Sequence, residues 1–149
     1  MRAVVQRVSQ ASVDVEDHIK GRIQNGLLVY LGVQDGDTQE DCRYIADKLT
    51  HLRVFSDHQG KMNLNVQDVQ GAILLVSNFT LCGDCRKGRR PGFDLAADPA
   101  LAEQRYEQVR QMIIDNGVPV ETGTFRAHMH VNSLNDGPVT FLLDSRKLF

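Results

Sequence analysis

The sequence predicts a mixed α/β fold, because two amphipathic helical segments interrupt several stretches that have the pattern of β-strands. The order along the chain is strands, helix, strands, helix, strands. No repeat, low-complexity tract or linker divides it. We therefore expect a single domain over residues 1–149, with antiparallel and mixed sheets curled into a barrel-like sandwich and two helices packed on one side.

The first third of the chain has the pattern of antiparallel strands. Polar and apolar residues alternate in AVVQRVSQASVDVE (3–16), and GLLVYLGV (26–33) is a continuous apolar run typical of a buried strand. The segment between them predicts a hairpin with a polar tip. Strand patterns return in LRVFS (52–56), GAILLVS (71–77), PVETGTFRAHMHVNS (119–133) and PVTFLLDS (138–145).

Two segments have the period of a helix that buries one face. The first follows a cap at Asp37 or Thr38, and its apolar residues recur at three- and four-residue steps: Cys42, Ile45, Leu49 and Leu52. The second begins at the cap Asp98 with Pro99 in its first turn, and Asn116-Gly117 is suited to end it. Its apolar stripe comprises Ala102, Tyr106, Val109 and Ile113.

Composition excludes several classes of protein. The chain is 42% hydrophobic and 24% charged, and no run approaches the roughly 18 uncharged apolar residues of a membrane span. The charged N-terminus lacks the pattern of a signal peptide, so we expect a cytoplasmic protein without membrane contact. Three cysteines argue against a disulfide framework. The net charge of −2 means that any RNA binding needs a local basic patch.

Such a patch follows the GAILLVS strand, in the irregular stretch CGDCRKGRRPG (82–92). It places four positive charges within five residues, at Arg86, Lys87, Arg89 and Arg90. Arginine offers paired donors that match phosphate. This pattern therefore favours contact with phosphate or RNA over the alternative, a cluster of charged side chains that simply face solvent.

The same stretch contains the C-x-x-C pair Cys82 and Cys85. The only candidates to complete a zinc site are His128 and His130, which would share one face if both lay in a strand. Their spacing is not that of a zinc finger. Free thiols and no bound metal are the favoured interpretation, and a zinc hydrolase is the weaker alternative.

No catalytic motif with a side-chain nucleophile is present: the chain has no G-x-S-x-G, P-loop, G-x-G-x-x-G or H-E-x-x-H. Ser77 and Thr80 are hydroxyls at a strand end without a base nearby in sequence, so structural roles are favoured for them. Near the C-terminus, residues 135–138 (NDGP) predict a turn between two strands. Its Gly137-Pro138 lacks a backbone donor and leaves carbonyl groups on display. An enzyme built on this chain would depend on main-chain donors, a substrate group or water.

Two stretches resemble the signatures of one family. SNFTL followed by RKGRRP, and NDGPVT, are similar to the S-Q-x-x-L and N-x-G-P-V-T motifs of D-aminoacyl-tRNA deacylases. MRAVVQRVSQASV, GLLVYLGV, LRVFSDHQGKMNLNV and VPVETGTF also match this family's pattern at the expected places. Because the resemblance covers essentially the whole chain, the sequence is identified as a member of this family.

The resemblance implies a homodimeric, cofactor-free hydrolase with active sites at the subunit interface. It would cleave the ester joining a D-amino acid, or glycine mischarged on alanine tRNA, to the terminal adenosine, releasing amino acid and tRNA as a proofreading step. Gly137-Pro138 of one subunit, in the cis form, would enter the other subunit's site and exclude L side chains. Arg7 would hold this Gly-Pro in place.

The family resemblance also implies roles for other residues. The backbone N–H of Phe79 would stabilise the oxyanion. Thr80 is the nucleophile in one view, whereas in the other the 2′-hydroxyl of the RNA assists water; we favour the second, because no base lies near Thr80. Phe125 and Met129 would line the adenosine pocket. The basic residues 86–90 would meet the acceptor stem.

Two departures from the family pattern leave alternatives open. Asn78 replaces the usual glutamine, and RAHMH (126–130) replaces the common GADMQ or AADMQ. Arg126, His128 and His130 are therefore specific to this chain's version of the motif. A related deacylase with relaxed chirality, or a module that binds aminoacyl-tRNA without hydrolysing it, remains an alternative to a strict D-specific enzyme.

Overall fold

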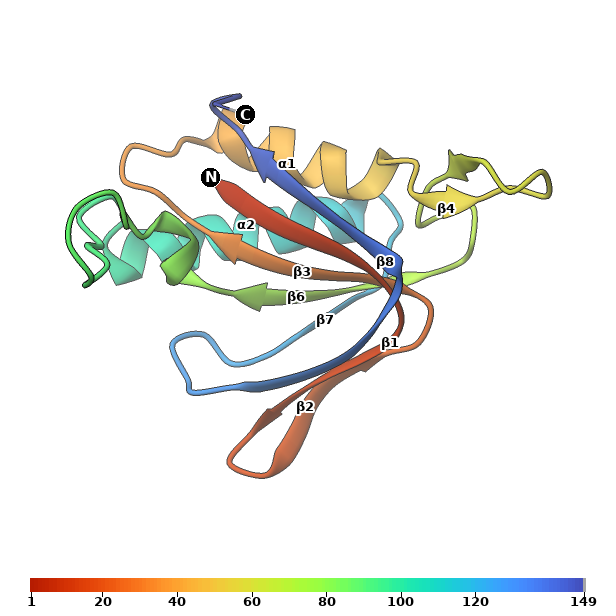
Figure 1. Ribbon diagram of the computed structural model, residues 1–149, viewed down its shortest axis with the longest axis horizontal. Helices are drawn as coiled ribbons and strands as arrows, with labels where there is room; N and C mark the ends of the chain where they lie inside the picture. The colour runs from red at the N-terminus through yellow and green to blue at the C-terminus, as the bar shows by residue number, and fades with distance from the viewer. Residues whose placement is uncertain (149) are drawn as a thin grey trace.

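The structure is a computed structural model that describes residues 1–148. One strongly curved sheet has the order β2-β1-β3-β6-β7, and β8 pairs with the other edge of β1 (Figure 1). These strands are β1 (Arg2–Val15), β2 (His18–Ile23), β3 (Gly26–Gly32), β6 (Ala72–Ser77), β7 (Val120–Thr122) and β8 (His130–Asp144). β4 (Phe55–Ser56) and β5 (Met62–Leu64) form a separate pair. The helices are α1 (Gln39–His51), α2 (Pro99–Asp115) and the short 3₁₀ helix η1 (Phe79–Cys82).

The predicted fold class is confirmed. β3, β6 and β7 are parallel neighbours, while β1 is antiparallel to each of its partners, so the sheet is mixed. Both helices lie on the same side of the curled sheet (Figure 1). No helix within residues 1–148 is long and apolar enough to cross a membrane.

The apolar run of β3 is buried on both faces, which explains why it lacks alternation. Leu27, Val29 and Leu31 pack into the larger core beneath the helices, whereas Leu28 packs into a smaller core on the opposite face. The smaller core is enclosed by the curl of the sheet, and its buried residues are Val8, Ala11, Val13, Ile23, Leu28, Leu74 and Val76.

Both predicted helices are confirmed, together with their caps. The Thr38 side chain accepts a hydrogen bond from the N–H of Glu40, and the Asp41 carboxylate reaches back to the N–H of Thr38 at 2.7 Å. In α2, the Tyr106 hydroxyl donates to the carbonyl of Leu75 in β6 at 2.7 Å. Burial raises the pKa of Tyr106, which keeps this hydroxyl protonated and available as a donor.

The predicted turn at residues 135–138 is wrong, because β8 continues through this segment. Thr140 faces Gln6 of β1 and Leu134 faces Gln10, so both halves of β8 pair with the same strand. Between these pairs β8 contains two more residues than β1, and the register shifts twice. The insert is therefore a bulge that displays backbone at the middle of a strand rather than at its end.

The strand pattern expected over residues 119–133 is only partly confirmed. β7 ends at Thr122 and β8 begins at His130, and a turn lies between them. Arg126 adopts a left-handed backbone conformation in this turn, with φ of 62°. His128 therefore lies outside the strand that contains His130.

A buried ionic cluster ties the start of β1 to the residues that follow β8. The α-ammonium of Met1 donates to the Asp37 carboxylate at 2.8 Å and to the Ser145 hydroxyl at 2.6 Å. Asp37 also accepts from Arg146 at 3.1 Å and from the N–H of Gln34 at 2.6 Å. Both Met1 and the Asp37 side chain are fully buried. The Asp37 carboxylate therefore neutralises the α-ammonium of Met1 at a buried position that water does not reach.

Asp37→Asn is therefore expected to lower the free energy of unfolding by about 3–5 kcal/mol, since it leaves a buried cation without its counter-ion. Urea denaturation of both proteins measures the loss. Asp35→Asn is the matched control because Asp35 is exposed, and it should change stability little. Equal stability of the two variants would contradict a structural role for the cluster.

Candidate active site at the ends of β3 and β6

A pocket of about 670 Å³ opens where the parallel strands β3 and β6 end. The carboxyl ends of parallel strands are a common place for ligand sites. Residues from these strands, from η1, from the start of α2 and from the turn after β7 line it. They include Ser77, Asn78, Phe79, Thr80, Phe125 and Met129, so the structure brings together six of the residues predicted for the site.

Asn78 fixes the first turn of η1. Its side-chain oxygen accepts from the N–H of Thr80 at 3.2 Å and from the Thr80 hydroxyl at 2.6 Å. Its own N–H donates to the carbonyl of Leu31 in β3. The shorter amide thus bonds within its own turn, and the Thr80 hydroxyl donates to a neutral amide oxygen that is not a base.

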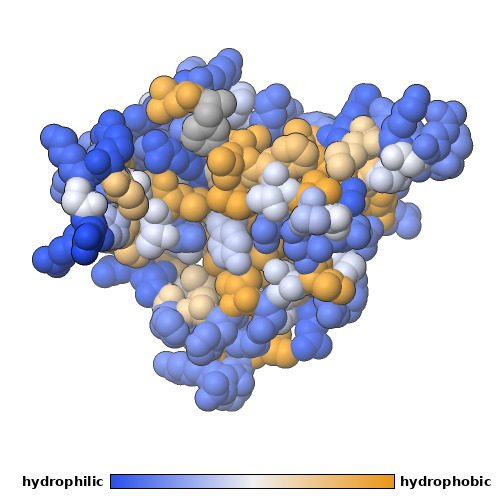
Figure 2. Space-filling model, viewed as in Figure 1, coloured by the Kyte–Doolittle hydropathy of each residue, from blue (hydrophilic) through white to orange (hydrophobic). Residues whose placement is uncertain are grey.

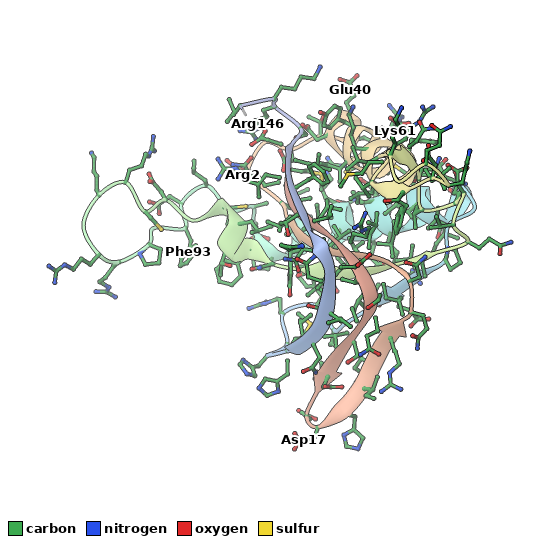
Figure 3. All side chains as sticks on the ribbon, turned by 45° about the vertical axis from the view of Figure 1, so that its right-hand side comes forward. Arg2, Asp17, Glu40, Lys61, Phe93 and Arg146 are labelled. Atoms are coloured by element: carbon green, nitrogen blue, oxygen red, sulfur yellow. The ribbon has the colours of Figure 1, made fainter. Side chains whose placement is uncertain are left out.

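Phe79 begins η1, so its N–H has no carbonyl of its own helix to bond. No other partner for this N–H lies within residues 1–148. Its side chain is 59% exposed and packs edge-on against Phe93, with ring centroids 5.0 Å apart. Phe93 lies beside η1, at the base of the loop that projects from the body (Figure 3). Phe79 therefore contributes both an apolar surface and an unbonded donor next to the pocket.

The opposite wall of the pocket is apolar and closely packed. Phe125 stacks obliquely against Tyr106, with ring centroids 6.0 Å apart. A Cβ atom at Gly123 would come within 2.4 Å of the Met129 sulfur, so a larger residue there would displace the Met129 side chain. Sequence reasoning missed Tyr30 and Tyr106, which also line the pocket; their positions in ordinary apolar patterns gave no signal of a site.

Gly137, Pro138 and Arg7 do not line this pocket. The Gly137-Pro138 peptide bond is cis, and both residues are exposed on β8. Arg7 donates to the carbonyl of Asp136 at 3.1 Å and to that of Val54 at 2.7 Å, and it also pairs with the Asp136 carboxylate. Arg7 thus lies against the bulge.

Two further features fix the bulge. The side-chain amide of Asn135 donates to the carbonyls of Arg7 and Val139, at 2.9 and 3.0 Å. Gly137 has φ of 137°, where a side chain would meet the Val139 methyl at 2.6 Å. The bulge therefore presents its backbone outward in one defined shape, away from the pocket of its own chain.

The basic residues 86–90 lie in the loop between η1 and α2, which projects from the body (Figures 1 and 3). Hydrophilic side chains cover this end of the molecule (Figure 2). Arg86 forms a paired interaction with Asp84, at 2.9 and 2.7 Å, and its hydrogen bonds hold the pKa of that carboxyl well below its usual range. Lys87, Arg89 and Arg90 form no ion pair within the described residues. Three cations of this loop therefore have no acidic partner among the described residues, while Arg86 is paired on the surface with Asp84.

The histidines and cysteines do not form a metal site among residues 1–148, since no group of three or more ligand side chains is gathered there. Cys82 is buried and approaches the carbonyl of Val33, while Cys85 is exposed. The rings of His128 and His130 lie edge-to-face, with centroids 5.0 Å apart.

The three thiols should differ in reactivity. Burial raises the pKa of Cys42 and of Cys82, and both are inaccessible, so only Cys85 should react rapidly with a disulfide reagent. Titration of the native protein should find one fast thiol, and titration in denaturant should find all three. Cys85→Ser should abolish the fast phase; a second fast thiol in the native protein would contradict the burial of the other two.

Comparison with known proteins agrees with this architecture. The D-Tyr-tRNA(Tyr) deacylase family matches residues 4–144 of the chain. D-aminoacyl-tRNA deacylases of Thermotoga petrophila and Anaeromyxobacter dehalogenans are 57% and 58% identical to it, and each match covers all of both chains.

Two solved structures share the fold. One, titled c-Myc DNA Unwinding Element Binding Protein, has a TM-score of 0.92 and 40% identity, covering 97% of this chain and 98% of its own. Another, titled as a probable eukaryotic D-amino acid tRNA deacylase, has a TM-score of 0.81 at 19% identity, covering 95% and 97%. With full-length relatives above 50% identity, the chain belongs to the D-aminoacyl-tRNA deacylase family and is a hydrolase of aminoacyl-tRNA.

Proposed function

We propose that the pocket at the ends of β3 and β6 holds the aminoacyl-adenosine end of tRNA and hydrolyses its ester when the amino acid is D or glycine. The observation that carries this proposal is the N–H of Phe79, an unbonded main-chain donor beside an apolar pocket. Such a donor stabilises the oxyanion that forms when a carbonyl is attacked. The reaction would take place in the cytoplasm, as a proofreading step in translation.

The nucleophile in this proposal is water, assisted by the 2′-hydroxyl of the terminal ribose. The Thr80 hydroxyl already donates to Asn78, and the pocket lining offers no carboxylate to take its proton. Ser77 lines the pocket at the end of β6, and its hydroxyl forms no hydrogen bond to His128, the lining imidazole, within the described residues. The side chains Thr80 and Ser77 therefore shape the site, and main-chain and substrate groups perform the chemistry.

Adenosine recognition in this proposal uses the apolar wall. Phe125 and Met129 provide flat and polarisable surfaces, and Tyr30 adds an aromatic ring from β3. Purine rings bind well between such side chains because stacking has little dependence on hydrogen bonds. Asn78 serves this site indirectly, by fixing the turn that presents Phe79.

Chiral selection in this proposal is made by a second copy of the chain. Gly137 and Pro138 are exposed on β8 and absent from their own pocket, so they can act only on the pocket of a partner. A twofold dimer gives each pocket one such bulge. β8 also exposes three large apolar side chains suited to an interface: Leu134, Phe141 and Leu142. The bulge's carbonyls would accept the substrate ammonium while its atoms exclude an L side chain.

The acceptor stem is bound by Lys87, Arg89 and Arg90 in this proposal, with Arg86 holding the loop through Asp84. A loop that projects beyond the pocket can reach the phosphates of the nucleotides that precede the terminal adenosine. Each phosphate contact adds to the salt dependence of binding.

The test measures deacylation of D-tyrosyl-tRNA and of glycyl-tRNA made on alanine tRNA, with wild type, Thr80→Ala and Ser77→Ala. We expect hydrolysis of both substrates, with each variant within about tenfold of wild type, because neither hydroxyl is a nucleophile. A loss of 10⁴-fold or more in Thr80→Ala would overturn the water mechanism. Binding of tRNA without turnover of either ester would instead support a binding module.

A further inference from the structure

Residues 126–130 contain three side chains able to carry positive charge: Arg126, His128 and His130. The proposed chemistry uses none of them. Arg126 and His128 line the pocket, and both are exposed. Arg126 stands at φ of 62° in a turn closed by the N–H of Ala127 and the carbonyl of Thr124, at 3.2 Å. A left-handed conformation is uncommon for arginine, and such departures gather at functional sites.

The charge around the pocket is of one sign. Its lining includes no Asp or Glu, although the chain as a whole has a net charge of −2. Within residues 1–148, the guanidinium of Arg126 and the ring of His128 form no ion pair or hydrogen bond. Their donors are therefore free for a ligand. An arginine is always charged, and an imidazole offers an N–H donor in either protonation state.

His130 supports this arrangement from the sheet. Its ring meets that of His128 edge-to-face, at 5.0 Å between centroids and 89° between planes. In the β1–β8 ladder His130 faces Asp14, whose Oδ1 is buried without a hydrogen-bond partner. This carboxylate lies on β1, opposite His130 in the ladder, and not in the lining of the pocket.

A bound aminoacyl-adenosine has a single anionic group close to it, the phosphodiester that joins its 5′ side to the preceding nucleotide. Its base suits the apolar wall and its ester suits the Phe79 N–H, so the phosphodiester must leave through the open mouth of the pocket. Arg126 and His128 are the lining residues whose chemistry matches it, because charged donors form the strongest hydrogen bonds to phosphate oxygens.

We propose that Arg126 and His128 form a subsite for the phosphodiester on the 5′ side of the terminal adenosine. This subsite rests on the proposed function, since it requires the aminoacyl-adenosine to occupy this pocket. It makes the enzyme prefer an ester carried on a nucleotide chain to the same ester on a free nucleoside. Arg126 and His128 are specificity residues in this account and take no part in breaking the ester.

The test compares three D-tyrosyl esters: adenosine alone, the dinucleotide CpA with its natural phosphodiester, and CpA with a neutral methylphosphonate link. For wild type we expect kcat/KM on natural CpA to exceed that on methylphosphonate CpA by about tenfold or more, as charge-assisted hydrogen bonds allow. Arg126→Asn suits the left-handed backbone while removing the charge. It and His128→Gln should each reduce this ratio at least threefold, and the double variant should bring it near one.

Activity on D-tyrosyl-adenosine should stay within about twofold of wild type in all three variants, which separates the subsite from damage to the pocket. Arg43→Gln, an exposed arginine on α1, is the matched control and should leave the ratio unchanged. A wild-type ratio near one, or variants that lose natural CpA and adenosine esters equally, would overturn the subsite. Failure to hydrolyse any of the esters, or D-tyrosyl-tRNA, would overturn the proposed function itself and the subsite with it.

Discussion

Replacing Phe79 with proline should lower kcat for D-tyrosyl-tRNA about 10²–10³-fold, the usual effect of losing one oxyanion donor. Proline lacks the N–H that we assign to the oxyanion. The position tolerates it, because Phe79 is the first residue of η1 and Asn78 before it is extended, with φ of −146° and ψ of 91°. Single-turnover deacylation, with protein in excess over tRNA, measures this step directly.

Phe79→Ala is the matched control, because it keeps the N–H but removes the ring that packs on Phe93. We expect it to retain most of the wild-type kcat and to affect mainly KM. Circular dichroism and urea unfolding of both variants verify that the fold is intact. If the alanine and proline variants lose kcat to the same extent, the ring rather than the N–H is responsible, and the assignment is wrong.

Mixing two inactive variants should restore activity if the bulge acts on the partner's pocket. Gly137→Ala should deform the bulge, since its side chain would meet Val139, and should abolish D-specific hydrolysis. Phe79→Pro leaves the bulge intact. In a mixed dimer, the Gly137→Ala chain contributes an intact pocket and the Phe79→Pro chain supplies an intact bulge to it.

Random exchange of subunits makes half of the dimers mixed, each with one complete site, so activity should return to roughly a quarter of wild type. Sedimentation should show a dimer before and after mixing. Two copies of the same variant, mixed in the same way, provide the control. Gly137 and Pro138 are exposed and do not line the pocket of their own chain. If activity does not recover although subunit exchange is verified, the bulge does not act on the partner's pocket.

The sequence allowed the helices and the buried strands to be predicted, because their signals are local, whereas the candidate site residues came from the family resemblance. Thr38 and Asp98 cap helices through contacts within three residues. The residues from Ser77 to Thr80 are adjacent in sequence and therefore reach the pocket together. The wall with Phe125 and Met129 came from the family resemblance and not from periodicity.

Features that depend on long-range pairing escaped prediction. The residues Asn135–Pro138 have the composition of a turn, but β1 pairs with both sides of them and turns the insert into a bulge. The pairing of Met1 with Asp37 requires tertiary positions that no short pattern contains, whereas the pair between Asp84 and Arg86 is local, two residues apart, and was overlooked. His128 lies outside the strand because Arg126 adopts a left-handed backbone conformation in the preceding turn. An arginine in the sequence gives no indication of such a turn.

The central claim is that backbone groups both hydrolyse the ester and select its chirality. Deacylation of matched D-tyrosyl- and L-tyrosyl-tRNA by the wild-type protein, with and without a chelator, tests it most directly. We expect rapid loss of the D ester in both buffers and at least about 10³-fold slower loss of the L ester, equivalent to a clash of about 4 kcal/mol. Equal rates for the two esters, or activity that disappears with the chelator, would contradict the claim.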